Sequence, residues 1–442
     1  MYDPLNVHDL VTDELRQLSE TGYDVTSLSA RLTDTDAHDR QGLENLLAEL
    51  ANLPRSGRWD YEEPDALPDI LDSMPAGQQT PSTLTPGSGL HDRILGGWLG
   101  RIAGCNLGKP IENGDYWTSD RIRSYLELTG SYPLRDYVPA MDPMPDGYRL
   151  VENWVNTTRG RVAGSDRDDD IDYSILALHM LEHHGMDLTA ADVAATWLAH
   201  VPYLRVFTAE RAAYVNLLTN VPIEAVGNTR NPYREWIGAL IRGDVHGWTQ
   251  PGRPQRAILT AYKDATLSHR ANGLYGEMWS AALMSSAATA TTVSEAFERS
   301  LHYVPVRSRL AEALHRVQDL HRGGVTWEEG LRSIQQHYGH YSWVHTVNNA
   351  AIIAAGLLWG DGDYSATVGL TVQGGWDTDS NGAAAGAVVG TVLGAAALPE
   401  HFIKPLQNRT RSAVFGYDNS RISDLADRTV TLATRDTSIS TV

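Results

Sequence analysis

The sequence contains one cysteine, three lysines and four phenylalanines among 442 residues. Cys105 alone can form neither an internal disulfide nor a zinc site built from several thiolates. Because the only lysines are Lys109, Lys263 and Lys404, arginine supplies nearly all of the 36 basic side chains, which we interpret as a bias of composition. With 55 acidic residues and a formal net charge of −19, the chain is a poor partner for a nucleic-acid backbone or an anionic membrane.

The sequence also lacks a recognisable leader and a convincing membrane span. The residues after Met1 have neither the basic start nor the apolar core of a signal peptide. The uncharged stretch from Gly382 to Leu398 approaches the length of a membrane-spanning helix, but it is mostly alanine and glycine, and Pro399 closes it. We therefore expect a buried helix there, in a soluble, cytoplasmic and monomeric protein that contacts no membrane.

By composition the chain divides into three parts. Residues 1–73 are predicted to form a small helical extension, because the leucines between Leu43 and Leu53 recur at helical spacing and fall on one face. Residues 74–90 are rich in proline, glycine, serine and threonine, which indicates a linker. Helical patterns dominate residues 91–442 and few segments alternate with period two, so the predicted fold class is all-α, with a compact multi-helix main domain.

The first predicted helix of the main domain has one side without bulky residues. Gly96, Gly100 and Gly104 recur every four residues, while Ile94, Trp98 and other apolar residues line the remaining surface. Glycines at this spacing favour close packing against another helix.

Two acidic clusters indicate chemistry. Asp377 and Asp379, followed by Ser380, lie in a turn before a run of small apolar residues, and a second cluster places five aspartates within the seven residues from Asp166 to Asp172. The ordinary structural interpretation is that such aspartates cap helices. The crowding favours a cation instead. With oxygen ligands, and no cysteine or histidine nearby, that cation would be magnesium, manganese or calcium rather than zinc.

Two other motif interpretations fail on particular residues. The sequence Asp377-x-Asp379-x-Asn381 matches the first half of an EF-hand loop, but Val388 stands where that loop requires a bidentate glutamate. An Asp-x-Asp after an apolar run is also typical of haloacid-dehalogenase nucleophiles. That chemistry needs alternating strands and helices and a later lysine with further acids, whereas only Lys404 follows.

Three well-separated motifs together resemble the ADP-ribosylglycohydrolase family, over roughly Asp92 to Tyr417. The family's first motif, GDALGxPxE, is matched from Gly104 to Glu112. Its second motif, Thr-Asp-Asp-Thr, is matched from Asp168 to Ile171, and its third, Gly-Asp-Thr-Asp-Thr, from Asp377 to Ser380. The resemblance implies an all-α fold with a dinuclear metal site, formed by two Mg²⁺ ions or, in their place, Mn²⁺.

The resemblance also assigns roles by position. The implied metal ligands are Asp168, Asp169, Asp170, Asp377, Asp379 and Ser380, and the implied catalytic residues are Glu112, Asp169 and Asp170. Two departures from the family motifs change the charge, because Cys105 replaces an aspartate and Asp168 replaces a threonine. Carboxylates beside an anomeric carbon can stabilise an oxocarbenium-like transition state, and magnesium can lower the pKa of an attacking water.

The implied activity is a magnesium-dependent glycosidase that cleaves an ADP-ribosyl group or a related ribosyl N-glycoside, present as a small molecule or linked to a protein. The expected substrate contacts are Asn272, Gly273, Tyr275, Glu277, Trp376 and His269, although a lone histidine is more often structural. Glu277 stands about where the family has an arginine, and it would be a poor partner for a diphosphate. A hydrolase of a small nucleoside or ribosyl metabolite is therefore an alternative, as is a non-catalytic protein that binds ADP-ribose or a nucleotide.

Overall fold

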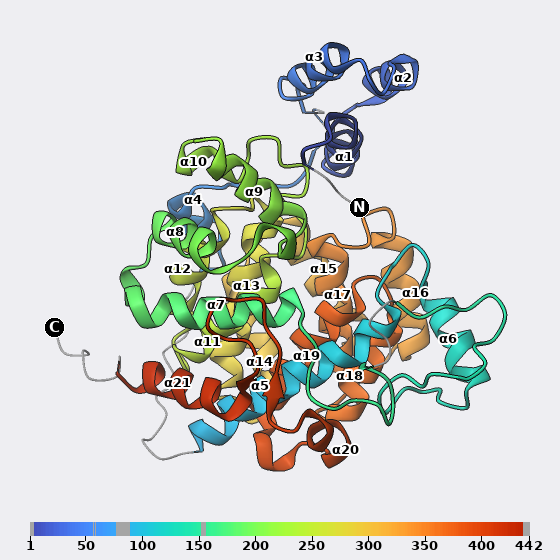
Figure 1. Ribbon diagram of the computed structural model, residues 1–442, viewed down its shortest axis with the longest axis vertical. Coiled ribbons are helices and arrows are strands. Elements are labelled where there is room, and N and C mark those ends of the chain that lie inside the picture. Colours follow the sequence, from blue (N-terminus) through green and yellow to red (C-terminus); the bar gives the residue numbers. More distant parts are fainter. Residues whose placement is uncertain (1–3, 56, 58, 77–88, 152–155, 436–442) are drawn as a thin grey trace.

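The computed structural model of the protein describes residues 4–55, 57, 59–76, 89–151 and 156–435. Nearly all regular structure in these residues is helical, which confirms the predicted all-α class (Figure 1). The α-helices are α1 (Val7–Glu20), α2 (Thr26–Asp34), α3 (Arg40–Leu50), α4 (Leu67–Asp72), α5 (Leu90–Gly108), α6 (Ser119–Leu128), α7 (Asp169–His184), α8 (Ala190–His200), α9 (Thr208–Leu218), α10 (Ile223–Val226), α11 (Asp244–Trp248), α12 (Pro254–Ala265), α13 (Asn272–Ala287), α14 (Val293–Ser300), α15 (Arg309–Arg322), α16 (Trp327–Tyr338), α17 (Thr346–Trp359), α18 (Tyr364–Gln373), α19 (Thr378–Leu393), α20 (Glu400–Ile403) and α21 (Ile422–Arg435).

Short 3-10 helices and one small antiparallel ladder complete the regular structure of the described residues. They are η1 (Lys109–Ile111), η3 (Gly185–Asp187), η4 (Tyr203–Arg205), η5 (Leu240–Arg242), η6 (Leu301–Tyr303), η7 (Ala395–Ala397), η8 (Lys404–Leu406), β1 (Arg409–Thr410) and β2 (Ser420–Arg421).

Helices α5 and α19 pack backbone against backbone near the centre of the main domain (Figure 1). A Cβ added at Gly104 would lie 2.0 Å from the carbonyl oxygen of Gly382, and one added at Gly100 would lie 2.2 Å from that of Gly386. Real Cβ atoms essentially never approach a neighbour within 3.0 Å, so only glycine permits this spacing. Because the two helices run in opposite directions, the end of α5 lies against the start of α19.

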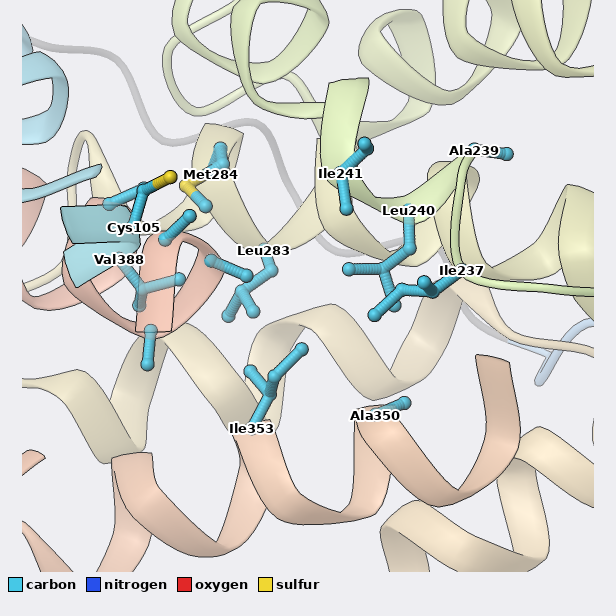
Figure 2. Close-up of a cluster of buried hydrophobic side chains, with 14 of the residues drawn as sticks. Cys105, Ile237, Ala239, Leu240, Ile241, Leu283, Met284, Ala350, Ile353 and Val388 are labelled. Atoms are coloured by element: carbon cyan, nitrogen blue, oxygen red, sulfur yellow. The ribbon is translucent and has the colours of Figure 1, made fainter. Parts of the chain in front are cut away.

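One large hydrophobic cluster extends through the main domain. Figure 2 shows part of it, with Cys105 of α5, Met284 of α13 and Val388 of α19 on one side of Leu283 and the residues around η5 on the other. Ile241 of η5 belongs to this cluster and also lines a large cavity. The core therefore directly supports the cavity wall.

Helices α1 to α3 form a smaller cluster of buried side chains that is separate from the main one. Polar contacts attach α1 to the main domain, because Gln17 donates to Glu235 at 2.8 Å and Glu14 pairs with Arg234 at 2.8 Å. Figure 1 shows these three helices at one end of the molecule. Ile70 of α4, in contrast, is buried in the main cluster.

Two segments that the sequence singled out can now be placed. The linker predicted over residues 74–90 falls mostly on residues 77–88, which lie outside the described part of the chain. The predicted buried helix from Gly382 is confirmed as part of α19, but it ends at Leu393, because Gly394 has φ +83° and breaks the helix. Among the helices of the described residues, none is both long enough and apolar enough to cross a membrane.

Candidate metal centre

Three segments that are far apart in the sequence meet where α5 ends and α19 begins. The first is η1, which follows α5 directly and leads to Glu112. The second is the start of α7, where Asp168 occupies the N-cap position and its carboxylate accepts a hydrogen bond from the Asp170 amide at 3.0 Å. The third is the start of α19, where Asp377 is the N-cap residue but makes no side-chain capping hydrogen bond. Its carboxylate instead forms a side-chain hydrogen bond with that of Asp379.

The acidic side chains form two groups that share Asp379. The first group consists of Glu112, Asp377 and Asp379, and one oxygen of each lies within 4.8 Å of the others. Three carboxylates from two different segments can surround one cation at this spacing. All of the ligands would be oxygens, as hard divalent ions prefer.

The second group consists of Asp168, Asp170, Asp379 and the thiol of Cys105, again within 4.8 Å of one another. The Ser380 hydroxyl donates to Asp170 at 3.1 Å and so joins the starts of α7 and α19. The other oxygen of Asp170, Oδ1, is buried and has no hydrogen-bond partner. This oxygen lies 3.6 Å from Nη2 of the buried Arg101 guanidinium, so a side-chain cation already faces it.

Burial and mutual repulsion raise the pKa of most of these carboxyl groups. Burial, followed by Asp168 and other neighbours, raises the pKa of Asp169 to about 8, and burial with Asp168 raises that of Asp379 to about 6. The pKa values of Asp170 and Asp377 are raised well above the ordinary range by burial and then by Asp379. Crowded carboxylates of this kind are stabilised in their ionised form by a nearby cation.

Two buried cationic side chains support the α7 side of the centre. The ammonium of Lys109 forms an ion pair with Asp168. Arg101 donates from Nε and Nη2 to the backbone carbonyl of Asp170, at 3.0 and 2.7 Å, and its Nε lies 3.1 Å from Asp244. Arg101 therefore fixes the backbone of a predicted ligand from the side of the protein core.

A cavity of about 870 Å³ opens over the acidic centre. All of the predicted metal and catalytic residues line it, including Asp169, which belongs to neither acidic group. Its other walls carry aromatic and basic side chains that the sequence had not indicated as substrate contacts: Phe207, Trp236, Trp343, Arg167, Arg205 and Arg211. The lining also includes the carboxylates of Asp166, Glu210 and Asp418. The aromatic faces and guanidinium groups can bind a ligand that has both a ring and a negative charge.

The predicted substrate contacts around α13 do not line this cavity. Asn272, Gly273, Tyr275, Glu277 and His269 are buried, and none of them lines it. Residues before α4 cover this region, since Asn272 donates to Glu63 at 2.7 Å and the Tyr275 hydroxyl donates to the Pro64 carbonyl at 2.5 Å. The prediction that these five residues contact the substrate thus finds no support in the geometry.

The surroundings of Glu277 and Trp376 also differ from the substrate contacts that the sequence suggested. Glu277 lies 3.3 Å from the guanidinium of Arg242, inside a fully buried group with Asp264. Trp376 is half-buried and packs against the main hydrophobic cluster, whereas Trp343 is the tryptophan nearby that lines the cavity. Trp343 lies in a loop outside every recognised motif, so no local pattern could have identified it.

The match to a family model agrees with the motifs. A family model described as ADP-ribosylglycohydrolase matches residues 86–438, which include all of the acidic segments. A solved structure described as an ADP-ribosylglycohydrolase-related protein complex is 18% identical, with 78% of this chain and 98% of that chain covered and a TM-score of 0.45. A search of curated proteins finds no significant match. On the extent of the family match, the protein belongs to the ADP-ribosylglycohydrolase family, whose members are hydrolases of glycosidic bonds.

Proposed function

We propose that the protein is a magnesium-dependent glycohydrolase that cleaves the glycosidic bond of an ADP-ribosyl group or a closely related ribosyl N-glycoside. The observation that carries this proposal is the convergence of Glu112, the start of α7 and the start of α19 on one wall of a single cavity. A helix-capping role alone would not require carboxylates from three segments to gather in two groups. Within each group, the ligand atoms lie within 4.8 Å of one another.

In this mechanism the chain's own residues hold the ion and handle the protons. Glu112, Asp377 and Asp379 would hold Mg²⁺, which when bound supplies a Lewis acid that polarises the sugar or lowers the pKa of a water. The carboxylates beside the sugar stabilise positive charge that develops at its anomeric carbon. Burial and Asp379 raise the pKa of Glu112 well above its usual value. A carboxyl group whose pKa is raised in this way can accept a proton from a water or donate one to a leaving group.

The walls of the cavity favour ADP-ribose over an uncharged nucleoside as the sugar-bearing group. Glu277 was the argument against a diphosphate, but it lies buried beside Arg242 and does not line the cavity. Arg205 and Arg211 do line it, and guanidinium groups bind phosphates in bidentate fashion. Trp343, on another part of the wall, supplies a face on which a base can stack.

The test is release of ribose-containing product from ADP-ribosyl-arginine, ADP-ribosyl-serine and free nucleosides, with Mg²⁺ or with EDTA. We expect hydrolysis of an ADP-ribosyl compound that requires the metal and falls at least about 100-fold in Asp377→Asn. Asp427→Asn is the matched control, because Asp427 is exposed and pairs with His91 on the surface. Unchanged activity in Asp377→Asn would contradict the metal mechanism. Tight ADP-ribose binding without hydrolysis would favour the non-catalytic alternative.

A further inference from the structure

Lys109 is unusual both as a lysine in this sequence and as a buried cationic side chain. It is one of only three lysines in a sequence whose other basic residues are arginines. Its side chain is 7% exposed, as is that of its partner Asp168, so the ion pair is shielded from water. The ammonium also donates to the carbonyl of Arg167 at 3.0 Å. A lysine places a compact point charge where the broad, planar guanidinium of an arginine would need more space.

The ammonium contacts one member of the second acidic group. Asp168, its partner, shares that group with Asp170, Asp379 and Cys105. Lys109 therefore already supplies a positive charge beside Asp168, which the family resemblance had implied as a metal ligand. Among the ion pairs of the described residues, none neutralises Glu112, Asp377 or Asp379, which make up the first group.

The donor set of the second group is also poor for a hard divalent ion. One of its four donors is the thiol of Cys105, and sulfur is a soft ligand that magnesium does not favour. Asp168 is engaged by the ammonium of Lys109. A divalent ion placed beside that ammonium would be repelled strongly at such depth, because buried charges are weakly screened.

We propose that the Lys109 ammonium replaces the second metal ion, so that the chain binds one divalent ion, held by Glu112, Asp377 and Asp379. This inference rests on the proposed function, because it presumes that the acidic centre binds a metal at all. Asp168 then serves as the partner of an internal cation, in place of the metal-ligand role predicted for it. The added negative charge of Asp168 and the positive charge of Lys109 cancel within the same site.

The experiment counts bound ions on the full-length protein. Mn²⁺ serves as the probe, with free Mn²⁺ measured by electron paramagnetic resonance during titration of metal-stripped protein. We expect one ion per chain for the wild type and for Lys109→Arg, which keeps the positive charge. We expect two ions per chain for Lys109→Met. Lys263→Met is the matched control and should bind one ion, because Lys263 lies elsewhere and donates to the carbonyl of Met186 at 3.1 Å.

The number of bound ions tests the role of Lys109 separately from the proposed metal-dependent function. Two ions on the wild type would overturn the role of Lys109 while leaving the metal-dependent function in place. One ion on both the wild type and Lys109→Met would also overturn it. No ion on the wild type would overturn the proposed function as well. Circular dichroism shows whether Lys109→Met is folded, and Lys109→Gln provides a second neutral variant if it is not.

Discussion

Replacement of Gly104 by alanine tests the contact on which the centre depends. The new methyl group would lie 2.0 Å from the Gly382 carbonyl oxygen, whereas ordinary contact begins at 3.4 Å, so α5 and α19 must separate by about 1.4 Å there. No side chain can move aside, because the obstacle is backbone. Overpacking of a core costs about 1–3 kcal/mol and occasionally more. We expect about 3 kcal/mol in the free energy of unfolding, since two rigid helices must shift.

The same shift should weaken metal binding. Helix α5 leads through η1 to Glu112, and α19 begins directly after Asp377, so separating the two helices at Gly104 separates two members of one acidic group. Metal–ligand distances tolerate changes of only about 0.2 Å. We therefore expect the Mn²⁺ affinity to fall by roughly tenfold or more, in the range seen when residues that support metal ligands are replaced.

Urea unfolding and Mn²⁺ titration of the full-length protein measure both effects. Gly57→Ala is the control, because an added Cβ there meets nothing within 4 Å. The added methyl group of Gly100→Ala would lie 2.2 Å from the Gly386 carbonyl oxygen. The double variant with Gly104→Ala should lose less free energy of unfolding than the two single variants lose together, because one separation of the helices relieves both contacts. A Gly104→Ala protein as stable as the Gly57→Ala control would refute the reasoning, and so would strict additivity.

Three further variants test single residues. Burial lowers the pKa of His345 from 6.5 to about 3. Between these two pH values the unfolded chain binds a proton at His345 that the folded chain does not bind. The free energy of unfolding therefore falls by about 1.4 kcal/mol for each pH unit below 6.5. His345→Asn keeps the helix cap and should remove this slope from urea unfolding; an unchanged pH profile would contradict the assignment. Arg101→Met leaves Asp244 buried without its guanidinium partner, and should cost about 3–5 kcal/mol in urea unfolding, whereas an unchanged midpoint would count against the pair. Glu112→Gln should lower kcat by about 10²–10⁴-fold while the metal-free protein melts no earlier than the wild type; full activity would exclude Glu112 from proton transfer.

The acidic centre could be predicted from the sequence because its signal is local. Each of the three motifs holds its functional residues within a few positions of a helix start or end, as Asp168 does at the start of α7 and Asp377 at the start of α19. The glycines of α5 were a further local signal, since their spacing predicted one slim side. The partner helix was not predictable, because Gly382 and Gly386 lie far along the chain from Gly104.

The walls of the cavity could not be predicted in the same way, because long-range contacts create them. Trp236 and Trp343 come from loops that pair with each other, the Ile237 amide donating to the Val344 carbonyl at 2.9 Å. Residues that looked accessible in the sequence were covered by the N-terminal segment, as Pro64 covers Tyr275. A motif shows which residues could react, whereas loop packing decides which of them the ligand meets.

The charge at position 277 illustrates why a substituted motif residue is weak evidence on substrate. A glutamate where relatives have an arginine looked like a barrier to a diphosphate, on the assumption that the side chain faces the ligand. In the fold, Glu277 is fully buried and lies 3.3 Å from Arg242, which also pairs with Asp264 at 3.1 Å. Arg242 further pairs with Glu210, which does line the cavity. Glu277 is therefore connected to the cavity only through this buried network, and substrate charge is better judged from the side chains that reach the cavity surface.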